Sequence, residues 1–422
     1  MEQKSNEKPI FRQKGILSSK DMIICCVNSA VGVGILKMGA AFTSGLIVSI
    51  LVLFIVCFLS YYSFKLLVLS AAKCHESTFE EIWKSEFSSK TIIVPVFFTS
   101  FSMLLSMVSY MREIQSSAIT ICSKILVVAT DQSDSITPKL QTYKMLVGSA
   151  VFVLFLIPVC CVAHVSSLVT MSYVSNCFLF LFLIYLIVMF GYEVKRVGFD
   201  PKHNFKLYQF KGHLTTCLST TIFAFNIHPL TYPGMKHVKD STQSNLLLIF
   251  RITMIIIMAN YFIAGLFSYL TYFDENTGII LDYYPENTET EKILMIIGRI
   301  LAFGFILLTI PFRLNACRYV ILSSISDILS FPPEIWTFTG IIISLLALSL
   351  ANLTEKFLTT LFIFSNIMAS FLLFIFTPIF YLKANGTSDH LHAFISISFL
   401  VIGVISIIVI ILVDGFSFSN AL

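Results

Sequence analysis

The chain is dominated by long apolar runs that are separated by short polar clusters. A run of about 20 apolar residues is the length that an α-helix needs to cross the hydrocarbon core of a bilayer. Hydrophobic residues make up 56% of the 422 residues and charged residues only 12%. A soluble protein of this length cannot bury that much apolar surface. The sequence therefore predicts an all-α integral membrane protein that crosses the bilayer many times.

Counting the runs predicts about eleven spans, which form a single transmembrane domain at 22–413. Residues 1–21 are expected to be an amino-terminal tail and residues 414–422 a short carboxy-terminal tail. Residues 113–128 are expected either to extend the third span or to form a short interfacial helix. The predicted spans lie near 22–44, 46–71, 91–112, 145–163, 168–192, 213–233, 247–272, 292–316, 334–351, 357–382 and 391–413.

The basic amino-terminal tail predicts a cytoplasmic start, because Lys and Arg gather on the cytoplasmic side of membrane proteins. With that orientation, Arg313 and Arg318 count with the cytoplasmic segment after the eighth span. The acidic loop at 273–291 then lies on the far side. The net charge of +4 gives no indication of a nucleic-acid partner, so the lipid bilayer is the expected environment. Nothing in the sequence indicates an oligomeric state.

Two of the predicted spans contain residues that interrupt a helix. The first holds NSAVGVGIL at 28–36, with an Asn, a Ser and two glycines. The sixth holds STTIFAFNIHPLTYPGM at 219–235, in which Pro229 and Pro233 each lack a backbone donor. In hydrocarbon, irregular backbone is tolerated only where it contacts protein or lines a wet cavity. Both segments are therefore expected to break.

Interrupted segments at corresponding positions of two five-helix halves are typical of an inverted-repeat transporter. The halves would run over about 22–192 and 213–382, followed by an extra helix at 391–413. Free N–H groups after the first break favour a carboxylate, whereas freed carbonyls and the Asn28 amide oxygen favour a cation. The alternative is that the glycines only let two helices pack closely and that the prolines are ordinary residues of membrane spans.

At these segments the chain resembles the amino acid/auxin permease (AAAP) family. NSAVGVGILKMGAAF resembles the first helix of that family, and FAFNIHPLTYPGMKHVKDST resembles its sixth. GRILAFGFILLTIPFRLNACR at 298–318 is similar to the eighth helix of the system A/N neutral amino acid transporters, and HVSSLVTMSYVS at 164–175 resembles the join between helices four and five. The chain also resembles the vacuolar amino acid transporters of this family. It implies a 5+5 inverted-repeat (LeuT/APC-like) transporter fold with broken helices 1 and 6.

The resemblance also implies a function, secondary active transport of a small-molecule amino acid coupled to H⁺ or Na⁺, with no other cofactor. Asn28 and Thr309 are the expected co-ion ligands for Na⁺. Relatives tend to carry a second Thr where this chain has Leu307, so proton coupling or simple exchange stays open. The expected substrate-binding residues are Ser29, Ala30, Gly32, Val33, Gly34, Phe223, Phe225 and Asn226.

Four polar or aromatic positions allow two interpretations each. Lys37 either snorkels toward the outer surface or lines the pathway as a proton or gating group. His228 is either a buried histidine with a backbone partner or a proton carrier. Phe223 and Phe225 either fill the core or cap the substrate as a gate. Arg299 is expected to be structural, with a carboxylate or a helix end as its partner.

Two other classes of function compete with transport. A sensor would bind an amino acid without moving it, and such proteins usually carry a long cytoplasmic tail, whereas about 20 residues precede the first span here. A membrane enzyme would need paired carboxylates, a nucleophile or a metal motif, and the sequence shows none. We expect a multi-pass protein of the plasma membrane or of a vacuolar or lysosomal membrane.

Overall fold

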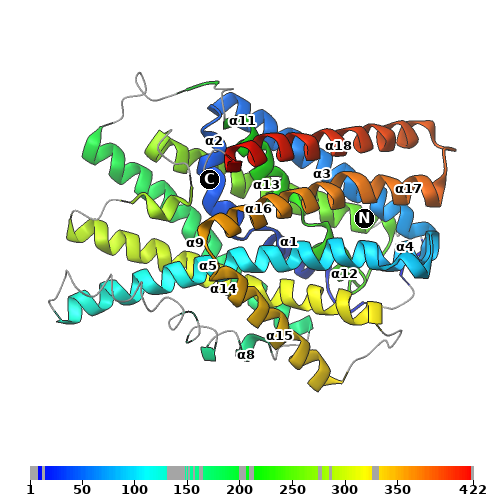
Figure 1. The fold of residues 1–422 in the computed structure, drawn as a ribbon, viewed down its shortest axis with the longest axis horizontal. Coiled ribbons are helices and arrows are strands. Elements are labelled where there is room, and N and C mark those ends of the chain that lie inside the picture. Colours follow the sequence, from blue (N-terminus) through cyan, green and yellow to red (C-terminus); the bar gives the residue numbers. More distant parts are fainter. Residues whose placement is uncertain are drawn as a thin grey trace, which may run out of the picture.

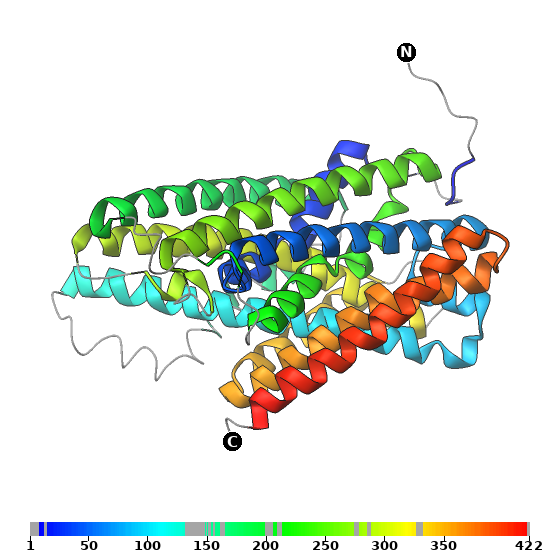
Figure 2. The ribbon, with the colours of Figure 1, turned by 90° about the horizontal axis from the view of Figure 1, so that it is seen from above.

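The computed structural model describes residues 8–11, 15–130, 148, 150, 153–154, 157–160, 165–198, 206–208, 213–273, 278–284, 288–325 and 332–419. These residues form helices and no strand. Most of the long helices run roughly along the long axis of the molecule, whereas the red carboxy-terminal helix runs obliquely to it in the second view (Figure 1 and Figure 2). Among the described residues, 8 helices are long and apolar enough to cross a membrane, or up to 9 if a bent pair counts as one span.

The prediction of a multi-pass helical membrane protein is confirmed. The predicted span at 145–163 lies largely outside the described residues, and the sixth span is split into two helices too short to be counted singly. α5 continues without a break through 113–128, so the prediction of an extended third span is confirmed. The spanning helices are α3 (Leu46–Cys74), α5 (Ile93–Thr130), α9 (Val165–Val197), α13 (Gln243–Tyr272), α14 (Glu289–Ile325), α15 (Pro333–Ala351), α16 (Glu355–Phe371) with η6 (Leu372–Phe376) and α17 (Thr377–Asn385), and α18 (His390–Ser419).

Besides the two broken spans, four short elements lie between these helices in the described part of the chain. They are α4 (Phe79–Glu86), η2 (Ser89–Thr91), α8 (Ile157–Cys160) and η5 (Ile280–Asp282). The eighth predicted span ends too early, because α14 runs on to Ile325. Arg313 and Arg318 therefore lie buried inside a helix, and their assignment to a cytoplasmic segment was wrong. The apolar run in the sequence ends where polar side chains appear. The helix nevertheless continues, because those polar side chains are buried by packing inside the protein.

The first span is broken as predicted. α1 (Ser19–Ala30) is followed by η1 (Val33–Lys37) and α2 (Met38–Phe42), and the two parts of this span are bent by 50°. Val31 has an extended backbone, although its N–H still donates to the Val27 carbonyl. A Cβ at Gly32 would lie 1.5 Å from the Tyr110 hydroxyl oxygen of α5. Only glycine lets the broken backbone approach α5 this closely.

The sixth span is broken at Asn226 and Ile227, between α11 (His213–Phe225) and α12 (His228–Met235). Pro229 explains the position of the break, because a proline ring clashes with the carbonyl four residues earlier in a continuous helix. That carbonyl belongs to Phe225, and it accepts a hydrogen bond from Ser60 Oγ at 3.0 Å instead. Pro233 lies inside α12, so of the two prolines only Pro229 is at the break.

The broken halves pair across the centre of the molecule. α1 contacts α12, and α2 contacts α11, so the part before one break lies beside the part after the other. α13 contacts both α1 and α2, and α14 packs against α5 and α9. Figure 1 shows α1 near the middle of the bundle and α2 and α11 at its upper edge, beside one end of α18. This arrangement brings the two irregular segments together.

The close contact at Gly32 gives the first testable prediction. Gly32→Ala forces the buried Tyr110 ring or the broken backbone to move, and overpacking of this kind costs about 1–3 kcal/mol. We expect a lower midpoint of thermal unfolding for the purified protein. Gly34→Ala is the matched control, because the nearest atom to its new methyl group is Ala224 Cβ at an ordinary 3.7 Å. Equal unfolding midpoints for the two variants would contradict the packing described here.

Candidate functional site

A cavity lies between the two broken helices. Its volume is about 20 Å³, which is room for about one water molecule. An amino acid is larger, so it can occupy this site only when the surrounding helices move apart. The cavity is lined by residues of both breaks and of α5, α13 and α14, namely Ala30, Gly34, Ser102, Met103, Ser106, Tyr110, Phe223, Ala224, Asn226, Pro229, Leu230, Tyr261 and Arg313.

The hydroxyl of Tyr261 on α13 joins the two breaks directly. It lies 3.0 Å from the Ala30 carbonyl at the end of α1 and 3.2 Å from the Ala224 carbonyl near the end of α11. Tyr261 is fully buried. Carbonyls freed by a helix break in hydrocarbon need a donor, and here the single Tyr261 O–H lies within hydrogen-bond distance of one carbonyl of each helix, which it shares in a three-centre bond. The aromatic ring of Phe225 packs edge-on against Tyr261, with the centroids 5.4 Å apart.

Arg313 of α14 lies at the same cavity. Its Nη2 donates to the Ser29 carbonyl at 2.9 Å, and its Nη1 donates to Ser106 Oγ at 3.0 Å. The guanidinium carbon lies over the Tyr110 ring, 4.7 Å from the centroid. Arg313 thereby connects α14 to the end of α1 and to α5. A positive charge at the carboxy-terminal end of α1 is also favourable for the helix dipole.

Next to the first break, Asn28 and Thr309, the co-ion ligands that the family resemblance implies, are in contact. Thr309 Oγ1 donates to Asn28 Oδ1 at 2.8 Å, and Asn28 Nδ2 donates to Ser172 Oγ at 3.1 Å. Ser175 Oγ lies 3.5 Å from Thr309 Oγ1. All four side chains are buried. These oxygens are neutral and hard, which suits a monovalent cation better than a transition metal.

The predicted residues of the second break lie in different surroundings. Phe223 and Asn226 line the cavity, and Asn226 Nδ2 lies 3.4 Å from Ser102 Oγ. Phe225 is fully buried beside Tyr261. His228 is fully buried against the stacked rings of Phe64 and Phe250, 5.7 Å from each centroid, and its Nε2 lies 3.1 Å from the Ser60 carbonyl. This is the geometry of a buried histidine with a backbone partner.

The predicted residues of the first break also differ in their surroundings. Ala30 and Gly34 line the cavity, whereas Ser29, Gly32 and Val33 do not. Ser29 contributes its carbonyl to Arg313, and Gly32 lies against Tyr110. The ammonium of Lys37 lies over the Phe362 ring of α16, 4.2 Å from the centroid. Phe362 in turn packs against the ring of Phe223, with the centroids 5.7 Å apart.

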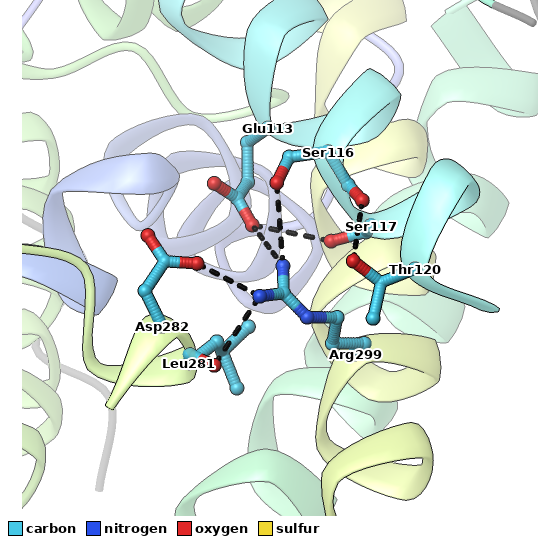
Figure 3. A network of polar contacts seen from close by, with 7 residues as sticks. All are labelled: Glu113, Ser116, Ser117, Thr120, Leu281, Asp282 and Arg299. Carbon is cyan, nitrogen blue, oxygen red and sulfur yellow. Dashed lines mark hydrogen bonds and ion pairs between the residues drawn. The ribbon is translucent and has the colours of Figure 1, made fainter. Parts of the chain in front are cut away.

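A second arginine of α14 forms an ion-pair network on the side where α14 begins (Figure 3). Arg299 Nη2 lies 2.7 Å from Asp282 Oδ1 of η5 and 3.2 Å from the Leu281 carbonyl. Its Nη1 lies 3.9 Å from Glu113 Oε1 and 3.4 Å from Ser116 Oγ, both on α5. The expectation that Arg299 has a carboxylate partner is confirmed. The network fastens η5 to α5 and α14.

On the opposite side of the bundle, Lys236 follows the end of α12. Its Nζ donates to the hydroxyl of Tyr319 on α14 at 2.7 Å, and this hydroxyl donates to Glu81 Oε1 at 3.2 Å. Burial lowers the pKa of Lys236, and the carboxylate of Glu81 acts against that shift. These contacts link the second broken helix to α14 and α4. Polar links therefore exist on both sides of the cavity.

The sequence did not indicate three residues that shape the cavity, Tyr110, Tyr261 and Arg313. The two tyrosines stand in predominantly apolar helices, where nothing distinguishes them from other buried aromatic residues. Arg313 could have been found, because an ionisable residue inside a spanning helix is a candidate functional residue in its own right. The early end assigned to the eighth span concealed that signal.

Comparison with known proteins is consistent with this geometry. The model of a protein family described as "Transmembrane amino acid transporter protein" matches residues 17–414. The solved structure of MhsT in complex with L-phenylalanine has a TM-score of 0.66, with 14% sequence identity, and the match covers 95% of this chain and 100% of that chain. At this identity the likeness shows the fold alone, which is the predicted inverted-repeat transporter fold.

Two curated relatives match a shorter part of the chain. The human Sodium-coupled neutral amino acid transporter 4 is 27% identical over 190 residues, 44% of this chain and 34% of that protein. Vacuolar amino acid transporter 7 of Saccharomyces cerevisiae is 27% identical over 184 residues, 42% of this chain and 35% of that protein. The matched part thus spans about a third of the length of each relative. Both are named as transporters and not as enzymes.

The bridge made by Tyr261 gives the second prediction. Tyr261→Phe leaves the Ala30 and Ala224 carbonyls without their donor, and a buried unsatisfied group costs about 1–3 kcal/mol. We expect a lower unfolding midpoint of the purified protein. Tyr272→Phe on the same helix is the control, because the Tyr272 hydroxyl is buried without a hydrogen-bond partner. If both variants unfold like the wild type, the hydroxyl does not hold the two breaks together.

Proposed function

Since the chain belongs to the transmembrane amino acid transporter family, we propose that it moves amino acids across a membrane by secondary active transport. The observation that carries the proposal is the cavity between two broken helices, with Tyr261 bonded to a carbonyl of each. In inverted-repeat transporters, substrate and coupling ion bind near mid-membrane at such breaks. One five-helix unit would rock against the other around this site.

The two ends of the substrate would bind to opposite ends of half-helices. The α-carboxylate would accept hydrogen bonds from the backbone at Gly32–Gly34, where η1 begins and the helix dipole is positive. The α-ammonium would approach the carbonyls near the end of α11. The Phe225 carbonyl already accepts bonds from Ser60 Oγ and the Ile227 N–H, whereas the Ala224 carbonyl accepts from Tyr261 and has a second lone pair for the ammonium. Phe223 and Asn226 would contact the remainder of the substrate.

Alternating access would require the two polar links to open in turn. The Arg299 network ties η5 to α5 and α14, and the Lys236 chain ties the end of α12 to α14 and α4. Opening one while the other holds would connect the cavity to one side of the membrane at a time. The membranes in which to look are the plasma membrane and a vacuolar or lysosomal membrane, the latter suggested by the name of the yeast relative.

Transport would be coupled to H⁺ or Na⁺. A sodium ion would replace the hydrogen bond between Thr309 and Asn28 and take both oxygens as ligands, with Ser175 nearby. The side chain of Leu307 has no oxygen, so backbone carbonyls would have to provide the remaining ligands of a sodium site. Proton coupling needs no such set of ligands.

Counterflow uptake in proteoliposomes tests the proposed function. We expect vesicles preloaded with unlabelled amino acid to accumulate the same labelled amino acid transiently, in a panel that covers neutral, acidic and basic side chains. Vesicles with heat-inactivated protein are the control. Saturable binding without accumulation of label for every amino acid would identify a sensor and contradict transport.

The coupling ion is tested by replacing sodium with choline and by varying the external pH. If sodium couples transport, Thr309→Val should raise the half-saturating sodium concentration on the order of tenfold, because about one hydrogen-bond-strength contact is lost. Thr271→Val is the matched control, since its hydroxyl donates only to the Phe267 carbonyl of its own helix. A flux that depends on neither sodium nor pH would contradict coupling to either ion.

A further inference from the structure

Arg313 is the only charged residue among the described residues that line the cavity. Its side chain is buried, with 8% of the residue exposed. Nη1 and Nη2 have acceptors in Ser106 and Ser29, but Nε has none. A guanidinium has five N–H groups, so donors remain for a further acceptor. Both of its partners are uncharged, and neither neutralises the positive charge.

Arg299 provides an internal comparison on the same helix. It is equally buried, yet it has Asp282 at 2.7 Å and Glu113 at 3.9 Å. For Arg313 no carboxylate of the described residues lies within 4.0 Å. Buried charges are usually paired, because an unpaired charge in a medium of low dielectric is unfavourable. An anionic group that binds at this guanidinium would therefore have a stronger electrostatic attraction to it than it would have in water.

The net charge of a substrate determines whether Arg313 attracts or repels it. A zwitterion with a neutral side chain has no net charge, and its carboxylate already has a place at Gly32–Gly34 in the proposed function. A lysine or arginine substrate would add a second positive charge beside Arg313. A substrate with a side-chain carboxylate brings one net negative charge, and a guanidinium can bind a carboxylate with two parallel hydrogen bonds.

We propose that Arg313 determines the substrate charge of this carrier, binding the side-chain carboxylate of acidic amino acids and excluding cationic ones. The inference rests on the proposed function and names its substrate class. Arg313 also holds the end of α1 through the Ser29 carbonyl. That structural role alone would affect all substrates equally, so the two roles can be separated.

The test is counterflow uptake of labelled glutamate, glutamine, alanine and lysine by the full chain in proteoliposomes. For the wild type we expect the order glutamate, then glutamine and alanine, with lysine excluded. Arg313→Gln keeps a polar donor but removes the charge, and should lower the glutamate-to-alanine uptake ratio roughly ten- to hundredfold, the range of a charge-assisted hydrogen bond. Arg313→Lys should retain a preference for glutamate. Arg251→Gln removes an exposed arginine of α13 as the matched control.

A second readout does not depend on flux. Glutamate should raise the unfolding temperature of purified wild type and of Arg313→Lys, but not that of Arg313→Gln, and lysine should raise none of them. If no amino acid is transported but glutamate still stabilises the wild type selectively, the proposed function fails and the charge selection stands. An unchanged glutamate-to-alanine ratio in Arg313→Gln, an equal loss for all substrates, or wild-type uptake of lysine that matches glutamate would each overturn the inference.

Discussion

The structure depends on how the bilayer constrains an interrupted helix. Backbone groups freed by a break cannot bond to lipid, so each must find a partner inside the protein. Here the freed carbonyls are bonded by side chains of neighbouring helices. Tyr261 serves Ala30 and Ala224, Arg313 serves Ser29, and Ser60 serves Phe225. The breaks are therefore held in place by α3, α13 and α14, and the cavity between them is a consequence of that support.

The same contacts connect the site to the elements that would move. α14 carries Thr309 and Arg313 beside the first break, Arg299 on one side of the cavity and Tyr319 on the other. Thr309 and Arg313 bond to α1, Arg299 bonds to η5 and α5, and Tyr319 bonds to α4 and to the residue after α12. A change in the position of α14 relative to α1 and α12 would thus alter the contacts at the proposed substrate site and at both polar links. This is the connectivity that alternating access requires.

The sequence was sufficient to predict the features that have a local cause. Pro229 forces a break directly after Phe225, the residue four positions before it, and the pairing of Asn28 with Thr309 followed from the family resemblance. Tyr110 and Tyr261 could not be predicted, because a hydroxyl in an apolar helix acquires a role only through tertiary packing. The end of α14 was misplaced since the hydropathy pattern cannot distinguish a buried arginine from one at a helix end.

The central claim is that two interrupted helices hold an amino acid between them. The most direct measurement is a structure of the protein determined with a transported amino acid bound. Our account predicts ligand density between α1 and α11, with the α-carboxylate at the backbone of Gly32–Gly34 and Tyr261 within reach. Density at another place, or continuous helices through residues 31–32 and 226–227, would contradict it.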